Sequence, residues 1–418
     1  MNNTDAEPPV ASEPVVASEP VAYAPIDTRE GYLDAVAAIA AGTGPIAIDA
    51  ERASGFRYSQ RAYLIQIFRR GAGTFLFDPP AIGDFSELND AVSDQEWVLH
   101  AANQDLQCLR EVGLHPTRIF DTELGARLAG LARVGLGTVV ESLLGIHLAK
   151  EHSAADWSTR PLPASWLVYA ALDVELLVDL REAIGKILDA AGKSDLAAQE
   201  FESVLIREPK PGSRGEGWRR LSGVHSIRGA QNLAVARELW ETRDRYAAEI
   251  DTAPGRLVPD SSLVAAAKAI PASKHALAAL KDFKGRASRS QLNRWWEAIE
   301  VGKASEDHPV LRVAGDSPPP PKAWADRNPE ADKRLKVARA SLSALSSELE
   351  IPLENLLTPD TLRRVAWAPP ASLDAASVSA SLAELGARAW QVEATAQLVV
   401  EAFVDAGQTN DQADEPAS

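Results

Sequence analysis

Two proline-rich breaks divide the chain and limit what it can fold into. Residues 207–217 (REPKPGSRGEG) and 305–324 (SEDHPVLRVAGDSPPPPKAW) combine Pro, Gly and charged residues, and the second break contains four consecutive prolines. Because proline lacks a backbone N–H and cannot continue a helix or a central strand, such segments favour extended linkers. We therefore expect this chain of 418 residues to form separate bodies rather than one continuous unit.

Composition sets further boundaries at both ends of the chain. The sequence VASEPV occurs twice before Tyr23, and the final stretch GQTNDQADEPAS is again acidic and polar. Such segments bury too little apolar surface to fold. The predicted organisation is a disordered acidic tail (1–23), a first body (24–205), a linker (206–216), a second body (217–303), a Pro-rich linker (304–321), a third body (322–405) and an acidic tail (406–418).

The first body combines strand and helix patterns. Three successive runs rich in β-branched and aromatic residues predict an antiparallel meander, and a fourth strand leads into a helix. These strands are predicted over 44–51, 62–70, 73–79 and 96–101, and the helix over 105–113. From residue 121 onward apolar residues recur every three or four positions, as in helices. We predict an α/β body with a mixed sheet, followed by two all-α bodies.

Charge is distributed unevenly along the chain, whose formal net charge is −16. Residues 26–200 hold 25 Asp and Glu against 15 Lys and Arg, whereas residues 218–303 hold 15 Lys and Arg against nine Asp and Glu. This asymmetry favours a first body that attracts metal cations and a second body that attracts phosphate. A basic, solvated helical surface would give the same count in the second body.

Other sequence features restrict the compartment and the cofactor. The single cysteine, Cys108, excludes an intramolecular disulfide and fits a reducing compartment. No apolar run approaches the ~18–20 residues of a membrane span, and the N-terminus lacks the pattern of a secretory signal. The sequence contains neither a Walker A nor a GxGxxG motif, and its seven His are scattered without zinc-ligand spacing. We expect a cytoplasmic protein with no membrane partner and no dinucleotide cofactor.

Acidic residues recur in the first body at positions that a sheet and its helices place together. Asp49 and Glu51 share one face of the first predicted strand, and a divalent cation would relieve their repulsion. Asp105 begins the predicted helix, where an acid also serves as a cap. Tyr169 and Asp173 lie one helical turn apart, a pattern that a core tyrosine beside an exposed acid would also give.

In this order and spacing, the five residues resemble the motifs of the DEDDy 3′→5′ exonuclease superfamily. The surrounding segments narrow the resemblance to the ribonuclease D family, over about residues 24–205. The matching segments are YLIQI (63–67), HAANQDL (100–106), FDTELGARLAG (120–130), DWSTRPLP (156–163) and YAALDVELL (169–177). The resemblance implies an RNase H-like exonuclease domain with a mixed sheet.

The resemblance also implies a role for each motif residue in a site with two divalent ions, Mg²⁺ or Mn²⁺. Asp49 would bridge both ions, Glu51 and Asp173 would complete the site of the ion that activates water, and Asp105 would hold the second ion. Tyr169 would orient or deprotonate the attacking water. Two such ions supply the nucleophile and stabilise the leaving oxygen in phosphodiester hydrolysis, and they prefer hard oxygen ligands.

The implied activity is that of a monomeric 3′→5′ exoribonuclease. It would release nucleoside 5′-monophosphates from structured RNA with a single-stranded 3′ end, in 3′ maturation of tRNA precursors and other small stable RNAs. Two alternatives stay open: an exonuclease acting mainly on DNA, and an RNA-binding scaffold with weak turnover. Contacts to the terminal 2′-OH would separate RNA from DNA, and the catalytic acids do not provide them.

The two helical bodies add candidate RNA contacts. The second body, 217–303, resembles the HRDC domain over 236–271 and 277–299, and the third, 322–405, resembles a second, diverged HRDC-like bundle. Each polar candidate also has a structural explanation: a bridging or capping role, or, for Arg160, the fixing of a loop. Asp121 is expected to cap a helix rather than bind metal. The candidate nucleic-acid contacts are Gln66, His100, Asn103, Arg160, Lys281, Lys284, Arg286 and Arg289.

Overall fold

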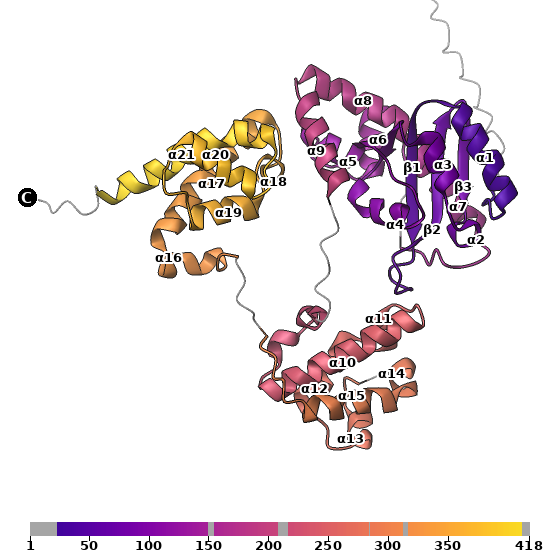
Figure 1. Cartoon of the computed structure of the whole chain (residues 1–418), viewed down its shortest axis with the longest axis vertical. Coiled ribbons are helices and arrows are strands. Elements are labelled where there is room, and N and C mark those ends of the chain that lie inside the picture. The colour runs from indigo at the N-terminus through magenta and orange to yellow at the C-terminus, as the bar shows by residue number, and fades with distance from the viewer. Residues whose placement is uncertain (1–22, 149–153, 208–215, 284, 312–316, 412–418) are drawn as a thin grey trace, which may run out of the picture.

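The computed structural model describes residues 23–148, 154–207, 216–283, 285–311 and 317–411. A five-stranded mixed sheet forms the centre of the first body (Figure 1). Its strand order is β3-β2-β1-β4-β5, with β1, β2 and β3 antiparallel and with β4 and β5 parallel to β1. The strands are β1 (Thr43–Arg52), β2 (Ala62–Arg70), β3 (Gly73–Phe77), β4 (Glu96–Leu99) and β5 (Arg118–Asp121). The mixed sheet and its antiparallel meander are confirmed, but the fifth strand was not predicted.

Helices cover both faces of this sheet. Strand β2 has six consecutive buried residues, as expected for a strand that is covered on both sides. Helix α7 packs across β1, β2 and β3 on one face, while α8 contacts β1 and β4. The helical elements of the first body are α1 (Arg29–Ala41), α2 (Pro79–Ile82), α3 (Ser86–Val92), η1 (Ala102–Gln104), α4 (Leu106–Glu111), α5 (Thr122–Leu128), α6 (Leu136–Leu144), α7 (Ala164–Glu175), α8 (Leu177–Ala190) and α9 (Ser194–Ile206).

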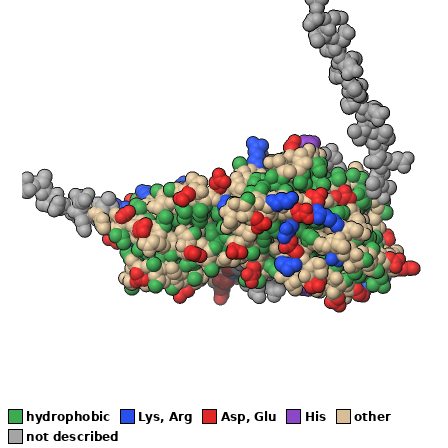
Figure 2. Space-filling model, turned by 90° about the horizontal axis from the view of Figure 1, so that it is seen from above, with side chains coloured by type: hydrophobic (Ala, Val, Ile, Leu, Met, Phe, Trp, Pro, Cys, Tyr) green, Lys and Arg blue, Asp and Glu red, His purple; other side chains and the backbone are tan. Residues whose placement is uncertain are grey.

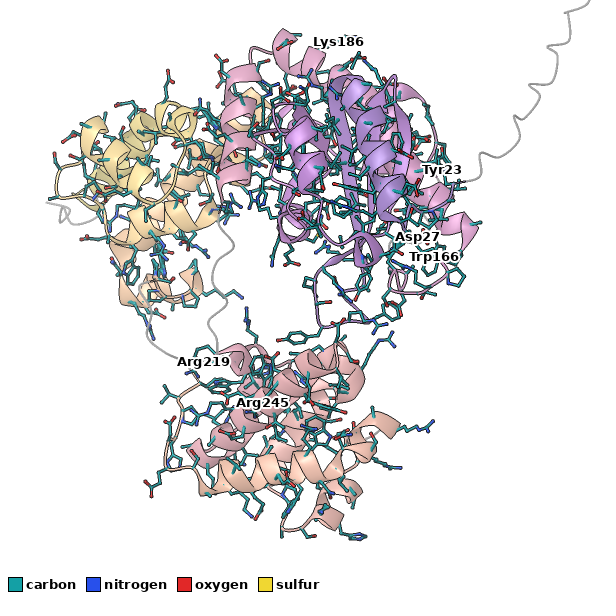
Figure 3. The ribbon with its side chains drawn as sticks, turned by 45° about the vertical axis from the view of Figure 1, so that its right-hand side comes forward. Tyr23, Asp27, Trp166, Lys186, Arg219 and Arg245 are labelled. Atoms are coloured by element: carbon teal, nitrogen blue, oxygen red, sulfur yellow. The ribbon has the colours of Figure 1, made fainter. Side chains whose placement is uncertain are left out.

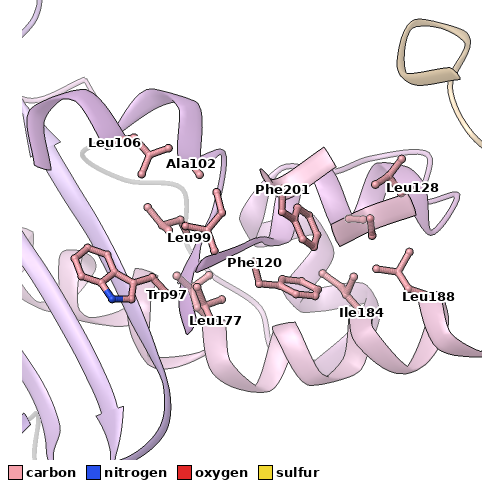
Figure 4. Packing of buried hydrophobic residues seen from close by; sticks show 14 of the residues in the cluster. Trp97, Leu99, Ala102, Leu106, Phe120, Leu128, Leu177, Ile184, Leu188 and Phe201 are labelled. Carbon is pink, nitrogen blue, oxygen red and sulfur yellow. The ribbon is translucent and has the colours of Figure 1, made fainter. Parts of the chain in front are cut away.

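The core between the sheet and the last two of these helices is built from large apolar side chains. Trp97 on β4 and Phe120 on β5 meet residues of α8 and α9 (Figure 4). The rings of Phe120 and Phe201 lie 4.7 Å apart between centroids. This packing anchors the edge strand β5, and with it the segment that begins at Asp121.

The second body is all-α, as predicted, and has its own apolar core around Trp218, Phe283 and Trp295. Its long helix α10 packs against α15 so closely that a Cβ at Gly302 would lie 2.6 Å from the Cα of Val235. Its elements are η2 (Gly217–Arg220), η3 (Val224–Ser226), α10 (Ala230–Glu249), α11 (Pro254–Leu257), α12 (Asp260–Ala269), α13 (Lys274–Ala279), α14 (Arg286–Ser290) and α15 (Leu292–Ala304).

The third body is also all-α, but its core is continuous with that of the first body. Arg388 donates two hydrogen bonds, of 2.5 and 2.6 Å, to the carboxylate of Glu200 on α9, and the Trp390 indole donates another of 2.8 Å. Seen from above in Figure 2, the two bodies form one continuous surface. The elements are η4 (Pro321–Ala323), α16 (Trp324–Arg327), α17 (Pro329–Leu349), α18 (Leu353–Leu356), α19 (Pro359–Trp367), α20 (Ala375–Glu384) and α21 (Ala389–Asp411).

The two helical bodies repeat one chain path. In each, a long helix is followed by a four-residue helix, an extended residue and a further helix. The extended residues have nearly the same backbone angles, φ −155° and ψ 125° at Val258 and φ −153° and ψ 128° at Leu357. The long helices end near residues with positive φ, Asp251 at 44° and Glu350 at 49°. This repetition supports the prediction that the third body is HRDC-like.

The turn after α10 binds the loop that joins β1 to β2 (Figure 3). Asp251 accepts hydrogen bonds from the Ser59 amide at 2.8 Å and from the Tyr63 hydroxyl at 3.2 Å. Arg256 donates to the Gly55 carbonyl at 2.9 Å and stacks 4.0 Å from the centroid of the Phe56 ring. The second body therefore holds the loop that follows Asp49 and Glu51 on β1.

Within the described ranges, none of the helices is both long and apolar enough to cross a membrane.

Candidate active site

Three carboxylates meet where β1 passes beneath α7. Asp49 and Glu51 project from the same face of β1, and Asp173 reaches them from α7. One oxygen from each side chain lies within 4.8 Å of the others. Strand alternation places the first two side by side, and the packing of α7 on the sheet adds the third.

Asp105 joins this group through a tight turn after β4. Ala101 has a positive φ of 62°, which turns the chain into η1, and Asp105 follows as the residue before α4. The buried carboxylate of Asp121 holds the turn by accepting hydrogen bonds from the amides of Ala101 and Ala102, at 3.0 and 2.9 Å. It also accepts from two amides of α5, which confirms its predicted capping role.

Cys108 packs beneath the same turn. Its side chain is 1% exposed, and its thiol donates to the Asp105 carbonyl at 3.1 Å. Burial raises the pKa of this thiol to about 12.

The acidic residues line a pocket of about 650 Å³. Tyr169 lies on its wall, one helical turn before Asp173, together with Arg52 and Phe56 from the end of β1 and the following loop. The five motif residues predicted from the sequence are thus brought together in one cavity. The described residues that line it are Asp49, Ala50, Glu51, Arg52, Ser54, Gly55, Phe56, His100, Ala101, Gln104, Asp105, Glu123, Gly135, Leu136, Ala154, Ala155, Tyr169 and Asp173.

The pKa values of the clustered acids are raised, because burial disfavours their charged forms. Burial raises the pKa of Asp173 to about 8, and the nearby Asp49 carboxylate adds to this effect. Burial and the charge of Asp49 also hold the pKa of Glu51 well above its ordinary value. The pKa of Tyr169 is raised by burial and then by the charges of Asp173 and Glu51, so its hydroxyl stays protonated at neutral pH.

This arrangement fits divalent cations. Several carboxylates whose oxygens lie within 4.8 Å of one another repel each other unless they are protonated or share a cation. The ligand atoms are hard oxygens, which suit Mg²⁺ or Mn²⁺. Asp49, Glu51 and Asp173 would hold such an ion directly, and Asp105 would support a second one beside Asp49.

Three other polar residues of the first body, predicted as nucleic-acid contacts, lie in different surroundings. His100 lines the pocket, with Nδ1 2.9 Å from the Thr122 hydroxyl, and burial lowers its pKa to about 4. Gln66 lies opposite Asp49 on β2 but is fully buried beneath α7. Asn103 lines a separate pocket of about 330 Å³ beside the third body, whereas its neighbour Gln104 lines the catalytic pocket.

Arg160 fixes a loop, one of the two roles considered for it. Its guanidinium donates to both carboxylate oxygens of Asp78, at 2.6 and 2.9 Å, and to the carbonyls of Tyr63, Trp157 and Thr159. All five N–H groups are thereby used within the protein, so a phosphate would have to displace Asp78 or a carbonyl.

The basic candidates of the second body are not among the residues that line the acidic pocket. Lys281 and the α14 residues Arg286 and Arg289 are exposed, and Lys284 lies outside the described residues. Their role in binding nucleic acid stays a prediction. Sequence reasoning missed Arg52 and Phe56, although their position directly after the first motif could have indicated them.

Comparison with known proteins identifies the class. Residues 23–189 match the family described as 3′-5′ exonuclease, residues 232–299 the HRDC domain, and residues 317–403 the family described as 3′ to 5′ exonuclease C-terminal domain. The fold and the acidic pocket thus define a 3′→5′ exonuclease.

One curated relative shows the family to which this chain belongs. The ribonuclease D of Pseudomonas paraeruginosa is 31% identical over 288 residues, which cover 64% of this chain and 75% of that protein. The chain belongs to the ribonuclease D family. Its alignments with other curated ribonucleases D span between 46% and 77% of the length of those proteins.

Two solved structures support the fold over most of the chain. A protein from Bifidobacterium adolescentis is 36% identical, with a TM-score of 0.83, and the match covers 91% of this chain and 96% of that one. Escherichia coli RNase D shares the fold, with a TM-score of 0.68 at 24% identity, over 92% of this chain and 99% of that one. The expected fold class, an RNase H-like exonuclease domain with HRDC-type helical domains, is confirmed.

Proposed function

We propose that this protein is a divalent-metal-dependent exoribonuclease that shortens RNA from the 3′ end and releases nucleoside 5′-monophosphates. The observation that carries the proposal is the convergence of Asp49, Glu51 and Asp173 with Tyr169 in one pocket. Curated ribonucleases D at about 31% identity support RNA as the substrate. We further propose that the RNA is a tRNA precursor or another small stable RNA with a single-stranded 3′ end.

The pocket residues would have distinct roles toward the attacking water and the phosphate. Two divalent ions held by the four acids would activate water and offset the charge on the leaving oxygen. Tyr169 keeps its proton, so its hydroxyl would orient the attacking water by hydrogen bonding instead of acting as the base. His100 is neutral at physiological pH and would contribute a polar wall without charge.

The helical bodies would hold the RNA that extends from the pocket. The second body is basic and contacts the loop after Asp49 and Glu51, which supports a role in guiding a strand toward the acids. We propose the domain boundaries predicted above, except that the third body extends to Asp411, because α21 continues through the first residues of the predicted tail. We also propose a monomeric state and a cytoplasmic location.

Matched 5′-labelled single strands of RNA and DNA test the function. They are incubated with the full chain in Mg²⁺, in Mn²⁺ and in chelator, beside the variants Asp49→Ala and Tyr169→Phe. We expect a metal-dependent ladder that shortens from the 3′ end on RNA and is lost in Asp49→Ala. A ladder on DNA alone would move the protein to the DNA-specific alternative. Binding without any ladder would favour the scaffold.

A further inference from the structure

Arg52 enters the catalytic pocket through an irregularity in the sheet. Consecutive residues of a regular strand point to opposite faces, so Arg52 would face away from Glu51. The pairing of β1 with β2 shifts register between these two residues, where Glu51 faces Leu64 and Arg52 faces Ala62. Such shifts re-aim side chains, and both Glu51 and Arg52 line the pocket.

Within the described part of the chain, the Arg52 guanidinium is held by charge alone. Its contact with the described part of the chain is an ion pair with Asp105, at 3.8 Å between Nη2 and Oδ1, and its side chain is 27% exposed. This distance is longer than a hydrogen bond, so the planar donor edge is available to a ligand. Arg160 gives the contrast, because all five of its N–H groups are used within the protein.

Arg52 is also the one Lys or Arg among the described residues that line the pocket. It faces Asp49, Glu51 and Asp105, and its charge lowers the pKa of each of them against the stronger effect of burial. A cation placed among acids compensates their charge when no divalent ion is bound. Divalent ions on the same acids weaken that attraction and leave the guanidinium free for an anion.

We infer that Arg52 is the phosphate-binding residue of the catalytic pocket: it pairs with Asp105 in the metal-free protein and with a phosphate of the RNA strand once divalent ions occupy the acids. Arg suits this role because its guanidinium binds two phosphate oxygens at once. The inference rests on the proposed function, since it requires divalent ions at the acids and a phosphodiester substrate.

The test compares Arg52→Gln and Arg52→Lys with wild type and with Arg70→Gln. Arg70 lies at the far end of β2 and pairs with Asp179 and Glu182, so its replacement removes the same charge away from the pocket. Three quantities are measured for each protein: the affinity for Mn²⁺ alone, the affinity for adenosine 5′-monophosphate with Ca²⁺, and the affinity for single-stranded RNA with Ca²⁺. Thermal unfolding checks that each variant is folded.

Arg52→Gln should change the metal and phosphate affinities in opposite directions. Mn²⁺ should bind several-fold more tightly, because the competing positive charge is gone. The nucleotide and the RNA should bind about tenfold or more weakly, because a charge-assisted contact is lost. The slope of log affinity against log salt for RNA should fall by about 0.7. Arg52→Lys should recover part of the nucleotide and RNA affinity that Arg52→Gln loses. Arg70→Gln should match wild type in all three affinities.

Two outcomes would overturn the inference while leaving the proposed function intact. One is unchanged nucleotide and RNA affinity in Arg52→Gln. The other is a parallel loss of Mn²⁺ and RNA affinity, which would show that Arg52 only supports Asp105. The proposed function itself fails if wild type binds no Mn²⁺, or if Asp49→Ala binds Mn²⁺ and shortens RNA as wild type does.

Discussion

Metal binding should release protons, because Asp173 holds one at neutral pH. The pKa of Asp173 lies at about 8, against an ordinary value of 3.8. At pH 7 a carboxyl with this pKa is about nine-tenths protonated, and it must lose its proton to bind a cation. One divalent ion should therefore release about 0.9 proton from Asp173 at pH 7, and Glu51, whose pKa is also raised, adds to this number.

The raised pKa of Asp173 also determines how the unfolding free energy of the metal-free protein changes with pH. A carboxyl with a raised pKa in the folded state stabilises the metal-free fold below its ordinary pKa, and that contribution is lost as pH rises through about 8. Each pKa unit of difference is worth about 1.4 kcal/mol, so ionisation of Asp173 costs the metal-free fold at most about 6 kcal/mol. Mn²⁺ should consequently raise the melting temperature more at pH 8 than at pH 5.

Isothermal titration calorimetry measures the proton release directly. Mn²⁺ is titrated into the metal-free protein at pH 7 and pH 9, in buffers with different ionisation enthalpies. The dependence of the observed enthalpy on the buffer gives the number of protons released. We expect about one or more at pH 7 and fewer at pH 9, with a decrease of about 0.9 at pH 7 in Asp173→Asn. Glu182→Gln, an exposed acid paired with Arg70, is the control. Enthalpies that do not depend on the buffer at pH 7 would refute the reasoning.

Four further perturbations test the surroundings of the site. Asp121→Ala leaves backbone amides of the 101–102 turn without an acceptor, so the unfolding free energy should fall by about 1–3 kcal/mol and Mn²⁺ affinity should fall with it. Asp251→Ala removes hydrogen bonds from Ser59 in the loop after β1 and from Tyr63 at the start of β2, and hydrogen exchange over 53–61 should increase while that of β1 is unchanged. Glu200→Gln removes the buried countercharge of Arg388, whose side chain is 16% exposed, and this should cost about 3 kcal/mol in denaturant unfolding. His100→Asn should leave the shape of the pH–rate profile between pH 6 and 8 unchanged, because the pKa of His100 lies at about 4.

Most of the sheet, and the acidic residues that line the pocket, could be predicted from the sequence. Strand β1 lies within one residue of its predicted bounds, and β2 matches its prediction, because each is rich in β-branched or aromatic residues and lies beside turn residues. Strand β5 escaped prediction, since four residues directly before a helix show too little alternation. The order and spacing of the acids predicted that they lie together, as they do in the pocket, although no single pair identified a metal site.

Features that depend on tertiary contacts were not predictable. The role of Arg52 depends on a register shift between β1 and β2, which strand periodicity does not encode. The shared core of the first and third bodies depends on pairs such as Glu200 with Arg388, which are 188 residues apart. Net charge does not predict this contact, because one largely buried ion pair and apolar packing decide it.

The buried thiol of Cys108 makes the native chain a ready background for fluorescence labelling. Alkylating reagents attack the thiolate, and a thiol that is 1% exposed with a pKa of about 12 does not supply it at neutral pH. Cysteines introduced at exposed positions such as Ala40 on α1 and Ser273 before α13 would then be the reactive thiols of the molecule. Energy transfer between dyes at such positions would report how the second body moves relative to the exonuclease sheet during each round of nucleotide removal, with every native side chain of the pocket still in place.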